Sequence, residues 1–417
     1  MDEVGIVGAQ SIAGAEEAPR PALKYRRKRS MARPIALGLF VLLLGALAAL
    51  HFMPLDTKSF EKAAEESLGQ PVKIGVIHLS LIPSPQLKME RITIGNETKV
   101  QIATLNASPQ LGSIWEAKKI FNRVEMEGLV LPPEMWEAVL WGKRDDTALK
   151  IGRVLVKGWK PDVEGLLLPP MDLDASFSKE GELEKVVAVN SEKTMTVKLG
   201  FSEGKTQIEL TGKPYKLPFT GDMEFKSFSG TGTLAANELI FSEFDAGAAE
   251  GTLTGNARLR WGANWSLEGE LNAKGLDAGK VASLLVSSGR LDGKGGYTMR
   301  APSPDKLIPS LRVEGSFSVQ KGTLGGVDLT RVLQGESISG GNTLFSEMNG
   351  SVLYDGGKVQ ARQVRLAAGL LNASGAVTMD AQKNLSGSMQ MELKAASTQI
   401  RASLTLGGTL TEPAFKR

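Results

Sequence analysis

Residues 69–95 read GQPVKIGVIHLSLIPSPQLKMERITIG, and the spacing of their apolar residues decides the fold class. Apolar residues alternate with others at period two, but the phase changes between Val76 and Ile77. Such alternation is typical of a strand with one buried face, and the phase change predicts a β-bulge at these two residues. Pro83 and Pro85 exclude central-strand pairing, so we expect the chain to turn there. The stretch therefore predicts a strongly curved antiparallel sheet.

The same alternation recurs through most of the chain, for example in LRVEGSFSVQ at residues 311–320. Glycine-led turns such as NGSVLYDGGKV at 349–359 separate these strands at irregular intervals, which indicates a succession of hairpins. Short helices are predicted at 56–69, 132–143, 276–289 and 327–335. The first has Asp56 or Thr57 to cap it and Gly69 to end it. The fold class predicted is mainly β: a transmembrane helix, then an extended, curved antiparallel sheet with an open groove and a few short helices.

Composition excludes several classes of function. The 417 residues contain no cysteine, which excludes disulfides, thiolate metal sites and cysteine nucleophiles. The net charge of +3 lies wholly in residues 1–33, and the rest of the chain is balanced. A sequence-independent nucleic-acid binder needs a basic excess, so we expect no nucleic-acid partner.

Residues 35–50, IALGLFVLLLGALAAL, are all apolar or glycine and predict a membrane-spanning helix. Its representative anchor residues are Ile35, Leu39, Leu43, Leu47 and Leu50. The residues that determine its orientation are Arg26, Arg27, Lys28, Arg29 and Arg33. Positive charge before the span places the N-terminus in the cytoplasm and the body outside it, which is the periplasm in a bacterium with two membranes.

Two alternatives to this anchor stay open. Ala46-Leu47-Ala48 matches a signal-peptidase site, so the segment can instead be a cleaved signal peptide. Met31 can also be the true start of the chain, which removes most of the basic cluster. The body is exported in each case. The predicted divisions are a cytoplasmic tail at 1–33, a transmembrane helix at 34–55, a β-rich region at 56–300 and a C-terminal β domain at 301–417.

The chain shows few residues suited to catalysis. It has only His51 and His78, which disfavours a Ser-His-Asp triad or a histidine metal site. GTGTLA at 230–235 lacks the strand-turn-helix context of a dinucleotide site and reads better as a glycine-rich strand. The acidic pairs Asp145/Asp146 and Asp172/Asp174 leave a glycan hydrolase as a remote alternative, with Trp261 and Trp265 as a sugar platform. We therefore expect no enzyme activity, metal or cofactor.

Both ends of the chain resemble the AsmA family of bacterial envelope proteins. The N-terminal likeness rests on the apolar helix, the short helix after it and LGQPVKIGVIHLSLIPSPQLKMERITIG at 68–95. The C-terminal likeness rests on GSFSVQKGTLGGVDLTRVL, GGNTLFSEMNGSVLYDGGKV, LLNASGAVTMD and LGGTLTEPAFKR, in that order. The resemblance implies a protein anchored in the inner membrane, with a periplasmic sheet whose apolar groove shields phospholipid acyl chains during transport toward the outer membrane. Membrane phospholipids, and other envelope proteins, are the partners it implies.

On this hypothesis the groove is lined by the inward residues of three strands near the C-terminus. The residues selected are Val313, Phe317, Val319, Met389, Met391, Leu404 and Leu406. Periodicity alone favours a sandwich or barrel whose apolar faces close on each other, because alternation cannot distinguish a groove from a core, and only the resemblance favours the groove. A further alternative is an anchored scaffold or regulator of outer-membrane protein assembly, which recruits a protein partner through an edge strand.

Overall fold

The computed structural model describes residues 41–42, 45, 55–80, 84–97, 99–142, 148–202, 204–214, 225–282, 285–335, 340–395 and 398–416. The chain divides between Leu50 and His51 into two units, and the second unit contains the fold described below. The predicted anchor residues and the basic residues before them lie outside the described residues. Within the part that is described, no helix is both long and apolar enough to cross a membrane.

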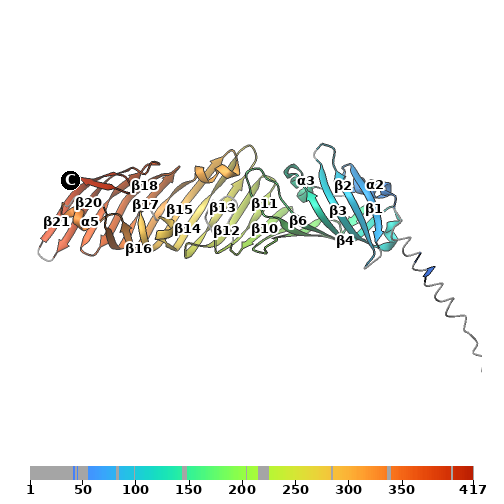
Figure 1. Cartoon of the computed structure of the whole chain (residues 1–417), viewed down its shortest axis with the longest axis horizontal. Helices are drawn as coiled ribbons and strands as arrows, with labels where there is room; N and C mark the ends of the chain where they lie inside the picture. Colours follow the sequence, from blue (N-terminus) through green and yellow to red (C-terminus); the bar gives the residue numbers. More distant parts are fainter. Residues whose placement is uncertain are drawn as a thin grey trace, which may run out of the picture. The chain divides into compact units, whose positions relative to one another are not determined.

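The second unit is mainly β and is built on one open, curved sheet of 22 strands, as the alternation predicts. Successive strands pair in chain order, so that the colours of Figure 1 pass in sequence along the sheet. The first half contains β1 Val72–Ser80, β2 Gln86–Ile94, β3 Val100–Pro109, β4 Lys119–Val130, β5 Leu149–Ile151, β6 Arg153–Trp159, β7 Met171–Phe177, β8 Leu183–Asn190, β9 Met195–Ser202, β10 Lys205–Gly212 and β11 Ser227–Ala235. The second half contains β12 Glu238–Ala248, β13 Gly251–Arg260, β14 Trp265–Asp277, β15 Val286–Ala301, β16 Arg312–Gly325, β17 Asn342–Asp355, β18 Lys358–Ala368, β19 Leu371–Met379, β20 Leu385–Ala395, β21 Thr398–Gly408 and β22 Pro413–Lys416.

Almost all of these pairings are antiparallel hairpins. The exception is β4, which pairs in parallel with β5 and β6. A parallel pair needs a crossover connection, and here residues 131–148 supply it, with the 3₁₀ helix η2 Pro133–Met135 and helix α3 Trp136–Trp141. The sheet continues from β15 to β16, across the position near residue 300 where the sequence predicts a domain boundary.

Short helices form at all four predicted places. They are α2 Thr57–Leu68, α3, α4 Ala278–Val281 and α5 Leu329–Leu333. The Asp56 side chain caps α2 by accepting from the Lys58 amide, and Gly69 ends it with a φ of 62°. Asp277 and Asp328 cap α4 and α5 in the same way. Asp56 and Gly69 therefore bound the first helix as the sequence predicts.

Strand pairing places the apolar residues on one face, called here the inner face. Val319 of β16 pairs with Met348, Met348 pairs with Leu366, and Leu366 pairs with Ala373. Directly paired residues point to the same side of a sheet, so this row of side chains shares one face. The opposite, outer face carries the charged and polar residues that alternate with them.

The sheet is sharply bent toward the inner face along its second half. Every strand from β11 to β20 contains an inward glycine, except β12 and β18, which each carry an extra residue in a bulge. A Cβ built on Gly315 would lie 2.4 Å from the Lys294 carbonyl oxygen, and one on Gly375 would lie 2.1 Å from that of Ser388. A Cβ on the outward Gly200 meets nothing within 4 Å. Backbones therefore approach most closely on the inner side, which makes that side concave.

The phase change in residues 69–95 has a different cause from the predicted bulge at Val76 and Ile77. The pairing register of β1 with β2 is the same before and after this point, so neither strand contains an extra residue there. Instead, Gly75 and Arg91 face each other at the change, and Arg91 has a φ of 55°. Gly128 continues the same line in β4 with a φ of 66°. All these strands twist together, which reverses their faces without shifting the register.

The two ends of the sheet are finished differently. At β1, the Glu65 and Glu61 carboxylates of α2 accept hydrogen bonds from the backbone amides of Val72, at 3.1 Å, and Ile74, at 2.8 Å. At the other end, β22 pairs only with Thr405–Gly408 of β21. Among the described residues, no strand pairs with the outer edge of β21 before Thr405.

The bend predicts a large difference between two glycine-to-alanine substitutions. Gly375→Ala puts a methyl group against a neighbouring backbone, so we expect it to lower the free energy of unfolding by about 1–3 kcal/mol. Gly200→Ala, the matched control, has open space and should raise that free energy by up to about 1 kcal/mol. Urea unfolding of both variants measures the difference, and equal midpoints would contradict the close approach at the bend.

Candidate functional site

Short segments of the chain itself cover much of the inner face. Phe60 of α2 packs in the cluster formed by β1–β4, and Leu140 of α3 packs against Leu199 and Ile208. Leu307, just before the 3₁₀ helix η4 Ile308–Ser310, packs on Leu267 and the strands beside it. Each of these segments closes the apolar face locally, as in an ordinary protein core.

Helix α5 is the cover over β16–β21. Leu329 and Leu333 are both fully buried, and their cluster includes Val319, Met391 and Leu404. The Thr343 hydroxyl fixes the start of the helix, since it accepts from the Leu329 amide at 2.9 Å and donates to the Val327 carbonyl at 2.8 Å. This half of the inner face is therefore a packed core.

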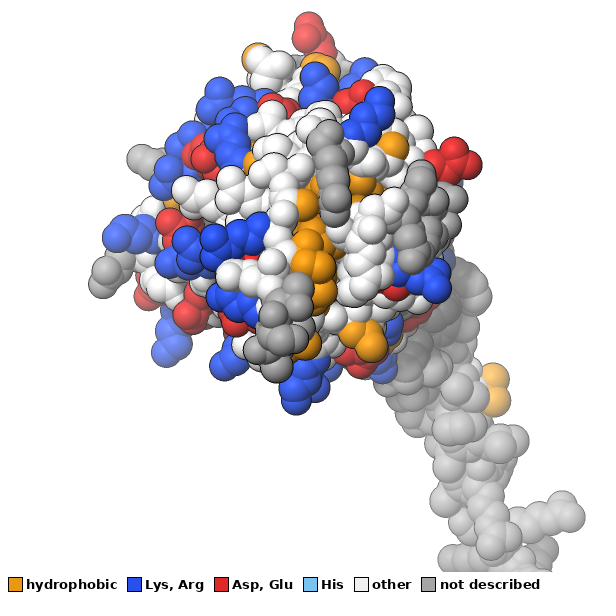
Figure 2. Space-filling view, turned by 90° about the vertical axis from the view of Figure 1, so that its left-hand side faces the viewer, with side chains coloured by type: hydrophobic (Ala, Val, Ile, Leu, Met, Phe, Trp, Pro, Cys, Tyr) orange, Lys and Arg blue, Asp and Glu red, His pale blue; other side chains and the backbone are white. Residues whose placement is uncertain are grey.

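The other half of the same strands carries an apolar surface that none of these core clusters includes. Two neighbouring rows of directly paired residues form this surface. The first row consists of Val313, Tyr354, Val359 and Met379, and the second consists of Val352, Ala361 and Val377. All seven are half-buried, and none belongs to the cluster packed around α5. We call these seven residues the open stretch. Figure 2, which views the molecule from the C-terminal end of the sheet, shows a narrow band of hydrophobic side chains without identifying individual residues.

All seven residues predicted to line a groove lie on the inner face, but they do not form one open surface. Val319, Met391, Leu404 and Leu406 are buried, and the first three lie in the α5 cluster. Phe317 and Met389 are half-buried at the edge of that cluster. Only Val313 belongs to the open stretch. The alternation in GSVLYDGGKVQA at 350–361 signals further members of this stretch, but the sequence does not reveal which inward residues α5 covers.

A tyrosine on the inner face reports a poorly solvated environment. Tyr297 pairs with Gly269 and Val313, and its hydroxyl donates to the Asn256 carbonyl at 3.0 Å. Burial raises the pKa of Tyr297 to about 12, because the phenolate would lose its solvation. The Tyr297 hydroxyl is therefore neutral at physiological pH and acts here as a hydrogen-bond donor.

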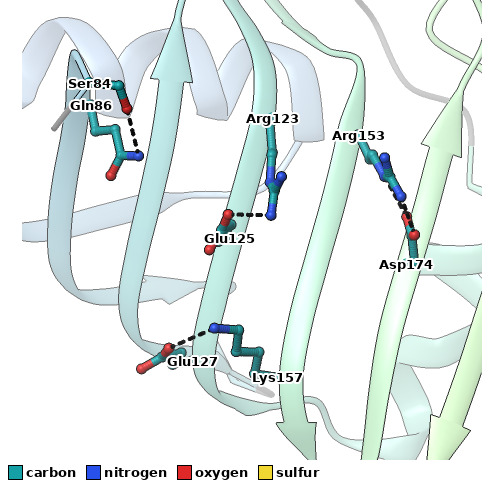
Figure 3. A network of polar contacts seen from close by, with 8 residues as sticks. All are labelled: Ser84, Gln86, Arg123, Glu125, Glu127, Arg153, Lys157 and Asp174. Atoms are coloured by element: carbon teal, nitrogen blue, oxygen red, sulfur yellow. Dashed lines mark hydrogen bonds and ion pairs between the residues drawn. The ribbon is translucent and has the colours of Figure 1, made fainter.

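Exposed ion pairs line the outer face, both between neighbouring strands and within one strand. Figure 3 shows Arg153 with Asp174, Arg123 with Glu125, and Lys157 with Glu127. The hydrogen bond from Arg153 lowers the pKa of Asp174. Exposed pairs of this kind contribute little to stability singly, so their main effect is to keep this face wet and polar.

A hollow of about 670 Å³ lies among β17–β21, and most of its lining side chains are polar. They include Asn349, Arg365, Asn372, Gln390 and Glu392. The Arg401 guanidinium lies 2.8 Å from Glu392 and lowers the pKa of that carboxyl. This lining does not suit an apolar ligand, in contrast to the open stretch on the other side of the same strands.

The residues considered for catalysis have structural partners. Asp172 accepts from the Gly158 amide at 2.8 Å, and Asp174 pairs with Arg153. Asp145 and Asp146 lie outside the described residues. Trp261 and Trp265 contact each other with ring centroids 6.2 Å apart, and GTGTLA forms part of β11. In the described part of the chain, no three His, Asp or Glu side chains gather as a metal site requires.

Comparisons with models of protein families, with curated protein sequences and with solved structures give no match to this chain.

The two halves of the inner face should respond differently to a charge. Leu404→Asp places a carboxylate in the α5 cluster, and we expect it to cost several kcal/mol and to abolish cooperative unfolding or soluble expression. Val377→Asp lies in the open stretch, where the side chain reaches water, and should cost about 1 kcal/mol or less. Thermal melts measure both effects. Equal loss of stability would contradict the distinction between covered and open halves.

Proposed function

We propose that the inner face of this sheet shields the acyl chains of phospholipids, in an envelope protein held in the inner membrane by its N-terminal apolar segment. The observation that carries the proposal is the open stretch, a continuous row of half-buried apolar side chains on a concave face. Monomeric soluble proteins rarely leave a contiguous apolar surface of this kind without a ligand or partner.

The length of the open stretch suits a single acyl chain. Its residues come from β16–β19, and β20 continues the inner face beside them. The four strands β16–β19, spaced about 4.8 Å apart, span about 14 Å. One leaflet of a bilayer is about 15 Å thick in its hydrocarbon part, so an extended acyl chain has a similar length.

Burial of methylene groups supplies the binding energy. Each CH₂ removed from water contributes about 0.8 kcal/mol, whereas the charged head group remains in solvent at the margin of the concave face. Neighbouring positions along the row differ little in chemistry, so displacement of a chain along it requires no reaction. The resemblance of both ends of the sequence to the AsmA family supports the same function, with transport toward the outer membrane as its direction.

The anchor in this proposal rests on the sequence of residues 35–50 and the basic cluster before it. A chain inserted with its N-terminus in the cytoplasm would expose the whole sheet on the other side of the inner membrane. Lipid leaving that membrane would then meet the sheet at its N-terminal end.

A second candidate function is the recruitment of an envelope protein by strand addition. It is favoured by β21, whose outer edge pairs with β22 only from Thr405 onward in the described structure. Unpaired edge groups of this length are able to accept an extended segment of another chain. This role predicts a protein partner and no lipid on the inner face.

Site-specific photocrosslinking tests the proposal with neighbouring residues as matched controls. We would place p-benzoylphenylalanine at Val313 or Val377, which face inward, and at Glu314 or Ala376, which are exposed on the outer face. Cells labelled with ³²P-phosphate are irradiated and the full chain is purified under denaturing conditions. We expect a radiolabelled lipid adduct from the inward positions only, because only these contact acyl chains.

The other outcomes separate the alternatives. Equal adducts from inward and outward positions would mean nonspecific contact with membrane and would refute the proposal. Absence of adducts at both inward positions, together with protein crosslinks from a probe at Arg401 on β21, would favour the scaffold.

A further inference from the structure

The loop between β3 and β4 displays a tryptophan almost entirely to solvent. Trp115 is 73% exposed and follows the 3₁₀ helix η1 Leu111–Ile114. Large aromatic side chains contribute strongly to binding when they find a partner. The ring of Trp115, held this far out on a folded surface, is available to a partner surface.

The loop that carries Trp115 is built rigidly. The Lys119 side chain is 4% exposed, and its ammonium donates to the carbonyls of Ile114, at 2.7 Å, and Glu116, at 2.6 Å. These two carbonyls flank Trp115 on either side. The Ser113 hydroxyl adds bonds to the Gln110 carbonyl at 2.8 Å and from the Ile120 amide at 3.0 Å.

The ammonium group of Lys119 is desolvated in this position. Burial lowers the pKa of Lys119, because the ammonium has left water for two carbonyls and an aromatic ring. Three side-chain donors on a lysine are sufficient to hold both carbonyls at once. The buried cation thus fixes the backbone so that the tryptophan points away from the protein.

The loop lies beside α2, the first helix of the body after the N-terminal apolar run. The Lys119 ammonium is 4.9 Å from the centre of the Phe60 ring, in the first turn of α2. The Leu55 amide, just before α2, donates to the Ile77 carbonyl of β1 at 3.3 Å. Six residues lie between Phe60 and Met53, the last apolar residue of the N-terminal run, and the seven Cα–Cα steps span at most about 25 Å.

We propose that the Trp115 loop docks on the head-group region of the membrane that holds the anchor, so that the N-terminal end of the sheet rests on the lipid surface. Tryptophan is the residue best suited to this interface, since its ring is apolar and its indole N–H remains hydrogen-bonded to water or head groups. The inference rests on the anchor in the proposed function, and not on lipid carriage by the inner face.

The absence of cysteine allows a clean test with the full chain. Trp115→Cys is labelled with the environment-sensitive fluorophore NBD and reconstituted into vesicles of phosphatidylethanolamine and phosphatidylglycerol that contain a nitroxide-labelled lipid. Leu344→Cys is the matched control, because Leu344 is 76% exposed and lies on β17, far along the sheet from β4. We expect a blue-shifted emission and several-fold stronger quenching at position 115.

Flotation of the same vesicles separates failure of the docking from failure of its premise. If the chain floats with the vesicles but both labels stay unquenched, the docking is overturned and the anchor stands. If the chain does not float, docking and anchor are overturned together. Strong quenching at both positions would indicate nonspecific adsorption and would also overturn the proposal. Lipid carriage by the inner face is judged separately by the photocrosslinks.

Discussion

The structure depends on how closely neighbouring backbones approach where the sheet bends. At Gly375 a Cβ would sit 2.1 Å from a carbonyl oxygen of the next strand, a distance that no side chain tolerates. The strands that lack an inward glycine there, β12 and β18, take an extra residue instead. Both solutions let an antiparallel sheet fold over itself while its hydrogen bonds continue. Without this bend the apolar side chains would form a flat surface and not a concave one.

Local periodicity was sufficient to predict the mainly β class and the faces of individual strands. The seven groove residues chosen from alternation all point inward, because a side chain's direction follows from strand phase alone. Capping residues also predicted the bounds of α2, as Asp56 and Gly69 show. These features are encoded over a few neighbouring residues.

Features that depend on contacts between distant residues could not be predicted from the sequence. Val313 and Val319 lie on one strand with the same phase, yet α5 buries only Val319. The phase change at Val76 has the sequence signature of a bulge, but the paired irregularity at Arg91 preserves the register. Lys119 gives no signal at all in the sequence, because its burial depends on the carbonyls of a loop and on Phe60. In each case the outcome depends on residues that are far away in the sequence.

Covering segments divide the inner face into regions with different properties. Residues under α2, α3 and α5 belong to separate apolar clusters, and each cluster has its own cover. These covers are inserted at strand ends, so they alter the width of the concave face without interrupting the strand pairing. A sheet of this kind can be closed in one place and open in another while the ladder of strands remains the same.

The contrast between the ends of the sheet gives the molecule a direction. The carboxylates of Glu61 and Glu65 accept hydrogen bonds from two edge amides of β1, those of Val72 and Ile74, so a further strand could not pair with these amides without displacing α2. Among the described residues, no strand pairs with the free edge of β21 before Thr405. During evolution, hairpins could therefore be added more easily at the C-terminal end, and the length of the sheet could change by duplication there while the end at β1 stayed the same.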